Sequence, residues 1–62
     1  MTERMFIKAD EIGKMLGISK SKAYQIIREL NAELKGQGYM VLGGKVNRSY
    51  FMKKFMIPNE EV

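Results

Sequence analysis

A single glycine, Gly17, divides the first half of the sequence into two stretches that have the residue spacing of helices. Before it, apolar residues at positions 12, 15 and 16 have the i, i+3, i+4 spacing of a short amphipathic helix over residues 9–16. After it, Ser19 is a good N-cap for a second helix over residues 20–35, which carries one apolar stripe. Glycine adopts the left-handed conformation that ends a helix without a Cβ clash. Gly17 therefore predicts a tight turn between two helices.

The remainder of the chain predicts a small β-element and a third helix. Residues 39–47, YMVLGGKVN, are two β-rich runs around Gly43-Gly44, which is typical of a two-residue hairpin. In that hairpin Leu42 is expected to pair with Lys45, and Val41 with Val46.

A third helix is expected over residues 49–56, before Pro58, with either Asn47 or Ser49 as its cap. Phe6 and Ile7 favour a short extended start, and the six methionines are expected to pack in a small irregular core. The order helix, turn, helix, hairpin, helix predicts a mainly α winged helix-turn-helix in one domain over residues 1–62.

Composition excludes several classes of protein. A chain of 62 residues forms one small domain, and it contains no Cys and no His, so disulfides, zinc fingers and thiol or imidazole chemistry are excluded. Its acids pair with no nucleophile or phosphate-binding loop, so we expect no enzyme, no catalytic residue, no metal, no cofactor and no small-molecule ligand. No apolar run approaches the roughly 18 residues of a membrane span, and the lack of Cys fits a cytoplasmic protein without a membrane partner.

The first turn of the second helix carries cations where acids are normally favoured. Lys20 and Lys22 lie at the positive end of the helix dipole, where each cation is unfavourable by about 0.3–1 kcal/mol. Residues 14–54 also hold nine Lys and Arg against two Glu. A polyanion beside this helix end would account for both features, and the second helix of a helix-turn-helix lies in the DNA major groove.

The residues expected to contact double-stranded DNA share one face of the second helix or belong to the wing. They are Ser19, Lys20, Ser21, Lys22, Tyr24, Gln25, Arg28, Lys45 and Arg48. Each has a plain alternative: a solvated charge for a lysine, packing against a neighbour for Tyr24, a solubilising charge at the hairpin for Lys45. Their joint placement favours DNA.

The segments IKADEIGKMLGISKSKAYQIIRELNAEL and GGKVNRSYF resemble the small winged helix-turn-helix proteins of the excisionase and MerR-like group, found in phages and mobile elements. The most specific part is EIGKMLGISKSKAYQIIREL, with Gly13, Gly17, Ile18, Ala23 and Ile26 at the small, turn and core positions. Excisionases of this group bind and bend attachment-site DNA and direct an integrase towards excision. The resemblance implies a sequence-specific architectural factor of a mobile element, with an integrase as candidate partner.

Two alternatives stay open at this stage. A small transcriptional repressor would use the same residues, and a protein-interaction module could use the same surfaces. MerR-type regulators carry a long dimerisation helix and an effector domain, neither of which is seen in this sequence. Their absence argues against ligand-sensing control and favours a stand-alone DNA-binding module. Because only NEEV follows Pro58 and one such module covers limited DNA surface, we expect a monomer in solution that binds adjacent DNA sites cooperatively.

Overall fold

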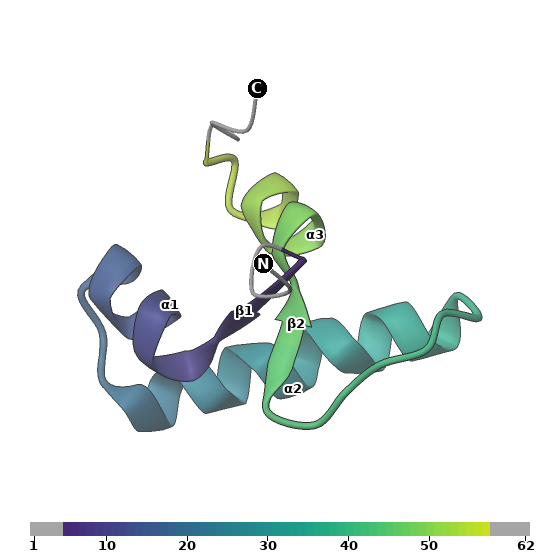
Figure 1. The fold of residues 1–62 in the computed structure, drawn as a ribbon, viewed down its shortest axis with the longest axis horizontal. Coiled ribbons are helices and arrows are strands. Elements are labelled where there is room, and N and C mark those ends of the chain that lie inside the picture. The colour runs from purple at the N-terminus through teal and green to yellow at the C-terminus, as the bar shows by residue number, and fades with distance from the viewer. Residues whose placement is uncertain (1–4, 58–62) are drawn as a thin grey trace.

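The computed structural model describes residues 5–57, which form a winged-helix-like fold of three helices and a two-stranded antiparallel sheet (Figure 1). The elements in chain order are β1 (Phe6–Lys8), α1 (Ala9–Leu16), α2 (Lys20–Gly36), β2 (Lys45–Asn47) and α3 (Arg48–Lys54). In Figure 1 the long helix α2 spans the molecule, α1 and the sheet lie along one side of it, and α3 stands beyond the sheet. The predicted fold class is confirmed.

The turn between α1 and α2 has the geometry that the sequence predicted. Gly17 is left-handed, with φ 68° and ψ 37°, and the N–H of Ile18 donates to the carbonyl of Gly13 at 3.0 Å. Ser19 caps α2, because its Oγ accepts the N–H of Lys22 at 3.2 Å. A Cβ on Gly13 would lie 3.0 Å from the carbonyl oxygen of Ile18, so the chain returns against a helix position that has no side chain. Two glycines therefore allow the close turn.

One hydrophobic core connects all five elements. Its buried members are Ile7, Ala9, Ile12, Ala23, Ile27, Leu30, Leu34, Val46, Phe51 and Met52. The apolar stripe of α2 supplies four of them, and Ile26 of the same stripe is half-buried at the edge. Each helix and strand contributes at least one fully buried side chain, so displacing any of them would expose the core to solvent.

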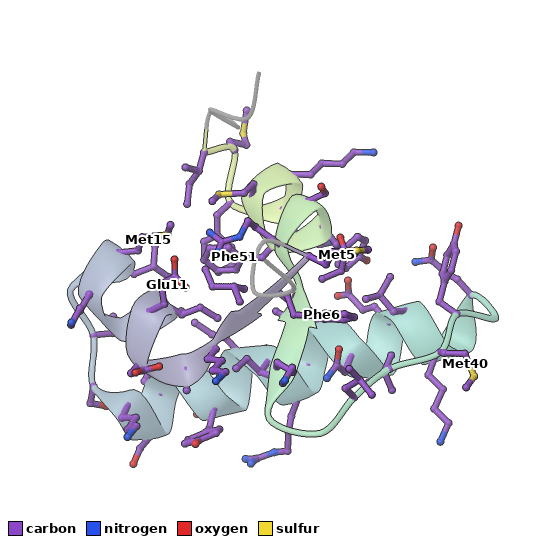
Figure 2. The ribbon with its side chains drawn as sticks, viewed as in Figure 1. Met5, Phe6, Glu11, Met15, Met40 and Phe51 are labelled. Carbon is purple, nitrogen blue, oxygen red and sulfur yellow. The ribbon has the colours of Figure 1, made fainter. Side chains whose placement is uncertain are left out.

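The methionines do not fill this core, contrary to the expectation from sequence. Met52 is buried, but Met5, Met15, Met40 and Met56 are between 41% and 95% exposed, and Met1 lies outside the described residues. Figure 2 shows Met15 and Met40 at opposite ends of the molecule, with Phe51 in its middle. The space between so few elements is already occupied by isoleucine, leucine, valine and phenylalanine side chains, which leaves the methionines at helix ends and in loops.

The strand pairing also differs from the predicted hairpin. The bridge between Leu42 and Lys45 forms as expected around the two glycines. Beyond it, however, Val46 pairs with Ile7 of β1 and not with Val41, so the residues before Leu42 form no strand. Ile7 is fully buried and Val46 is 1% exposed, whereas Val41 is only half-buried. Lys45 pairs with Lys8 along one edge of β2 and with Leu42 along the other, so β1 adds a strand to β2 while the predicted hairpin partner contributes a single bridge.

α3 is capped by Asn47, which settles the choice between Asn47 and Ser49. Its Oδ1 accepts the N–H of Tyr50 at 2.9 Å. The helix starts one residue earlier and ends two residues earlier than expected, and Met56 follows it in a left-handed conformation with φ 56°. The N–H of residue 57 then donates to the carbonyl of Met52 at 2.9 Å, which closes the helix end.

A polar brace outside the core connects α2 with α3. The hydroxyl of Tyr50 donates to Oε1 of Glu33 at 2.7 Å, and Nζ of Lys54 lies 3.2 Å from the same oxygen. The hydrogen bond from Tyr50, followed by that from Lys54, lowers the pKa of Glu33. The hydrogen bond to Glu33 raises the pKa of both Tyr50 and Lys54. Near neutral pH Glu33 is therefore ionised while Tyr50 and Lys54 keep their protons, which are the states that these contacts require.

Replacing Gly17 by valine should destabilise the protein by about 1 kcal/mol or more, because a β-branched residue resists positive φ. A Cβ at Gly17 meets nothing within 4 Å, so the whole cost is backbone strain. Thermal or urea unfolding measures it. Gly36→Ala is the matched control, because that site is also open but its φ is not positive. The unfolding free energy of this variant should equal that of the wild type or be slightly higher. Equal melting temperatures for Gly17→Val and wild type would contradict the turn geometry.

Candidate nucleic-acid interface

The first half of α2 presents a polar face to solvent. The residues on it that are exposed are Ser19, Lys20, Ser21, Lys22, Tyr24, Gln25 and Arg28. Ala23 and Ile27 point the other way, into the core. The first turn of α2 contains no acid, so nothing on the helix itself offsets the positive end of its dipole.

Three of these residues form a line along the helix. Lys20, Tyr24 and Arg28 are spaced by four, and residues at this spacing are neighbours on a helix surface. At 1.5 Å per residue the line is about 12 Å long. Tyr24 is 43% exposed, so its ring is accessible on this face and is not enclosed by neighbours. The face therefore combines cations, an amide and an aromatic ring over the length of two helical turns.

The line continues directly to the wing, by which we mean residues 39–47. Asn31 lies three residues beyond Arg28, and its Nδ2 donates to the carbonyls of Leu42 at 3.0 Å and of Lys45 at 2.9 Å. These two residues form the bridge that closes the turn of the wing. A single amide therefore uses both of its hydrogens to hold the wing onto α2, at the end of the polar face.

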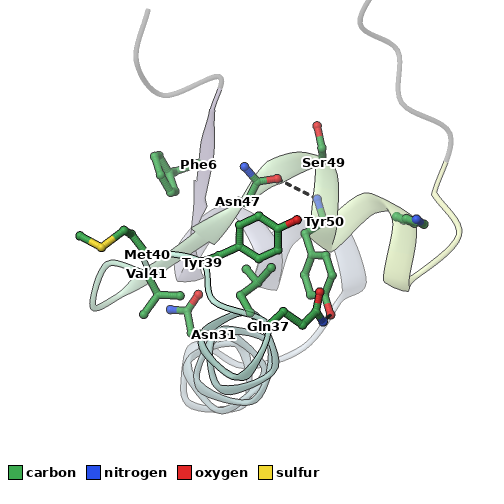
Figure 3. Close-up of a pocket in the computed structure, with 11 residues that line it drawn as sticks. Phe6, Asn31, Gln37, Tyr39, Met40, Val41, Asn47, Ser49 and Tyr50 are labelled. Atoms are coloured by element: carbon green, nitrogen blue, oxygen red, sulfur yellow. Dashed lines mark hydrogen bonds between the residues drawn. The ribbon is translucent and has the colours of Figure 1, made fainter.

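The arm of the wing, residues 39–41, is held less closely. An open hollow of about 440 Å³ lies between the arm, the end of α2 and the start of α3 (Figure 3). Tyr39 and Met40 line it and are 60% and 95% exposed. The arm is fixed at its two ends, since the N–H of Tyr39 donates to the carbonyl of Leu34 at 3.0 Å and Val41 packs against the core, and the bonds from Asn31 hold the turn that follows.

Sequence reasoning missed Asn31. The available signal is a polar side chain with two donor hydrogens, half-buried between Leu30 and Leu34 of the apolar stripe. A polar group at such a position requires hydrogen-bond partners. The sequence does not indicate that those partners are wing carbonyls eleven and fourteen residues away.

Lys45 and Arg48, both expected to contact DNA, have different surroundings in the structure. Lys45 is half-buried at the start of β2, and its backbone is held by Asn31. Nη2 of Arg48 instead lies 3.1 Å from both carboxylate oxygens of Glu11, and the arginine side chain is only 23% exposed. Arg48 therefore connects the start of α3 with the first turn of α1, and its guanidinium already has an anionic partner.

Within residues 5–57 no group of acids, His or Cys could hold a metal ion. In the same part of the chain no helix combines the length and apolar character needed to cross a membrane.

The chain is 52% identical over 46 residues to the ICEBs1 excisionase of Bacillus subtilis (strain 168), and the alignment covers 74% of this chain and 72% of that protein. No protein-family model matches the chain. No solved structure matches it either.

Asn31→Ala should loosen the wing, since it removes both hydrogen bonds to the bridge. We expect a loss of about 1–3 kcal/mol in unfolding free energy, at about 0.5–1.5 kcal/mol for each of the two bonds. Amide hydrogen exchange at residues 44–46 should become faster while exchange in α1 stays slow. Gln25→Ala, an exposed polar change on the same helix, is the control and should leave both quantities unchanged. Unaltered exchange in the wing of the Asn31 variant would show that the amide does not hold it.

Lys22→Glu should raise stability and weaken DNA binding. The acid would stand at the third position after Ser19, where it completes a capping box, and it would replace a cation at the positive helix end, for a gain of about 0.3–1 kcal/mol. Lys35→Glu, in the last turn of the same helix, changes the charge equally but should lower stability, because a cation is favourable there. Thermal melts recorded beside binding curves separate the two effects. Parallel loss of stability and binding in Lys22→Glu would mean that this lysine is structural.

Proposed function

This chain belongs to the excisionase family, and we propose that it binds double-stranded DNA of a mobile element in a sequence-specific manner and acts as an architectural factor in excision, with an integrase as its protein partner. Excisionases are accessory factors and not enzymes, so the proposal assigns no catalytic residue. The observation that carries it is the exposed polar face of α2, whose first turn holds lysines and no acid.

We propose that α2 lies in the major groove of the DNA. An α-helix fits this groove, and the N-terminal residues of the second helix of a helix-turn-helix reach base edges there. Gln25 can bind adenine and Arg28 can bind guanine, each through two hydrogen bonds. Lys20 and Lys22 suit the phosphates on either side, because they add positive charge to a helix end that already attracts anions.

The remaining residues of the face have supporting roles. Ser19 and Ser21 can donate to phosphate oxygens, and Tyr24 can lie against a sugar or a thymine methyl group. Lys45 can contact a phosphate beside the groove, since Asn31 holds its backbone at the end of the α2 face. We leave Arg48 out of the contact surface because Glu11 already pairs with it.

Binding to duplex DNA should weaken steeply with salt. If about six phosphates are contacted, log K should fall against log[salt] with a slope near −5, at −0.9 for each phosphate. Arg28→Ala or Gln25→Ala should relax sequence preference and cost about 1–3 kcal/mol at the matching base pair, whereas Lys20→Ala should weaken all sequences alike. Fluorescence anisotropy over a salt series, on attachment-site and unrelated duplexes, measures each effect. A flat salt response would refute DNA binding.

The protein should be a monomer in solution that fills adjacent DNA sites cooperatively. A single module of this size buries about 600–1,000 Å² on DNA, which limits the affinity of one copy. Sedimentation without DNA, followed by gel shifts on duplexes carrying one or several sites, tests this expectation. The protein should bind a duplex with several adjacent sites more tightly per site than a duplex with one site, and the complex with several sites should migrate in the gel as bent DNA. A stable dimer in solution, or a single site bound as tightly as the array, would instead favour a conventional dimeric repressor.

A further inference from the structure

A second lysine lies directly opposite Lys45 in the sheet. The register of the two strands pairs Phe6 with Asn47, Ile7 with Val46, and Lys8 with Lys45. Directly opposite residues share a face of a sheet, and successive residues alternate between faces. Since Ile7 and Val46 are buried in the core, the face that carries both lysines is the outer one. Lys8 is exposed and Lys45 is half-buried.

Lys8 is unfavourably placed in the free protein for two independent reasons. Like charges directly opposite each other on neighbouring strands destabilise a sheet. Lys8 is also the N-cap residue of α1 and makes no side-chain capping bond, at a position where Ser, Thr, Asn or Asp would stabilise the helix. A lysine there adds a cation to the positive end of the helix. One side chain thus breaks two local rules at once.

Two acids, Asp10 and Glu11, lie in the first turn of α1, but neither forms an ion pair with Lys8. Asp10 accepts the N–H of Glu11 at 3.1 Å, and Glu11 pairs with Arg48. Within residues 5–57 neither Lys8 nor Lys45 has an ion pair or a side-chain hydrogen bond. The two lysines therefore occupy directly opposite positions on the outer face of the sheet, and no acid of residues 5–57 pairs with either of them.

The pair also has a fixed position relative to α2. Asn31 holds the carbonyl of Lys45, and β1 is paired along β2 (Figure 1). The sheet is thereby attached to the helix one turn beyond Arg28, so the lysine pair lies beside the end of the polar face of α2.

We propose that Lys8 and Lys45 together bind one DNA phosphate beside the groove that α2 occupies, so that β1, and not only the wing, belongs to the DNA-binding surface. The inference rests on the proposed function. A phosphate between the two ammonium groups removes their repulsion, so the arrangement that is unfavourable in the free protein becomes favourable in the complex.

The test combines stability with binding. Lys8→Gln should raise the melting temperature, reduce the salt slope by about one, and weaken duplex binding roughly fivefold at 0.15 M salt, the effect of losing one phosphate contact. Lys8→Glu should raise the melting temperature further, through an ion pair with Lys45, and bind DNA still less well. Lys53→Gln, the loss of another exposed cation, on α3, is the matched control and should leave the slope unchanged.

Each contrary result has its own meaning. If Arg28→Ala weakens binding but Lys8→Gln keeps the wild-type affinity and salt slope, the lysine pair is not a phosphate site and the proposed function stands. If Lys8→Gln loses stability and affinity in parallel, Lys8 is structural and the inference is wrong. If the wild-type protein shows no salt-dependent binding to any duplex, the proposed function and the inference both fail.

Discussion

The close return of the chain after α1 is the constraint on which the rest of the structure depends. Ile18 comes so near to Gly13 that a Cβ there would lie only 3.0 Å from its carbonyl oxygen, and Gly17 supplies the left-handed residue that makes this return possible. The angle between α1 and α2 follows from these contacts. β1 enters α1 without a break, so its position, and with it the position of β2 and the wing, is set by the same turn.

Two parts of the surface break local rules that normally stabilise a folded chain. The first turn of α2 places Lys22 where an acid would complete a capping box, and the outer face of the sheet places Lys8 opposite Lys45. Local rules are broken mainly where function requires it. By contrast, Glu33 with its partners on α3 and Glu11 with Arg48 are ordinary ion pairs on the outside of the fold.

The elements that sequence predicted well are those with local signals. The turn at Gly17, the cap at Ser19 and the stripe of α2 each depend on residues within a few positions, and all are present. The pairing of β2 could not be predicted in this way, since Val46 meets Ile7 from the other end of the chain. Asn31 was missed because its role depends on carbonyls that only the folded wing brings near. The exposure of the candidate contact residues on α2 could be predicted because it follows from the local spacing of the helix, and their contact with DNA stays a prediction.

The surface location of the methionines has a consequence for chemical damage. Oxidation converts a methionine into a polar sulfoxide, which disrupts a packed interior but is readily hydrated at a surface. Within residues 5–57 four methionines are already open to water, and the one enclosed by the core, Met52, is 8% exposed. Oxidants that reach this protein would meet the outer thioethers first, and those can react while the packing around Phe51 stays intact.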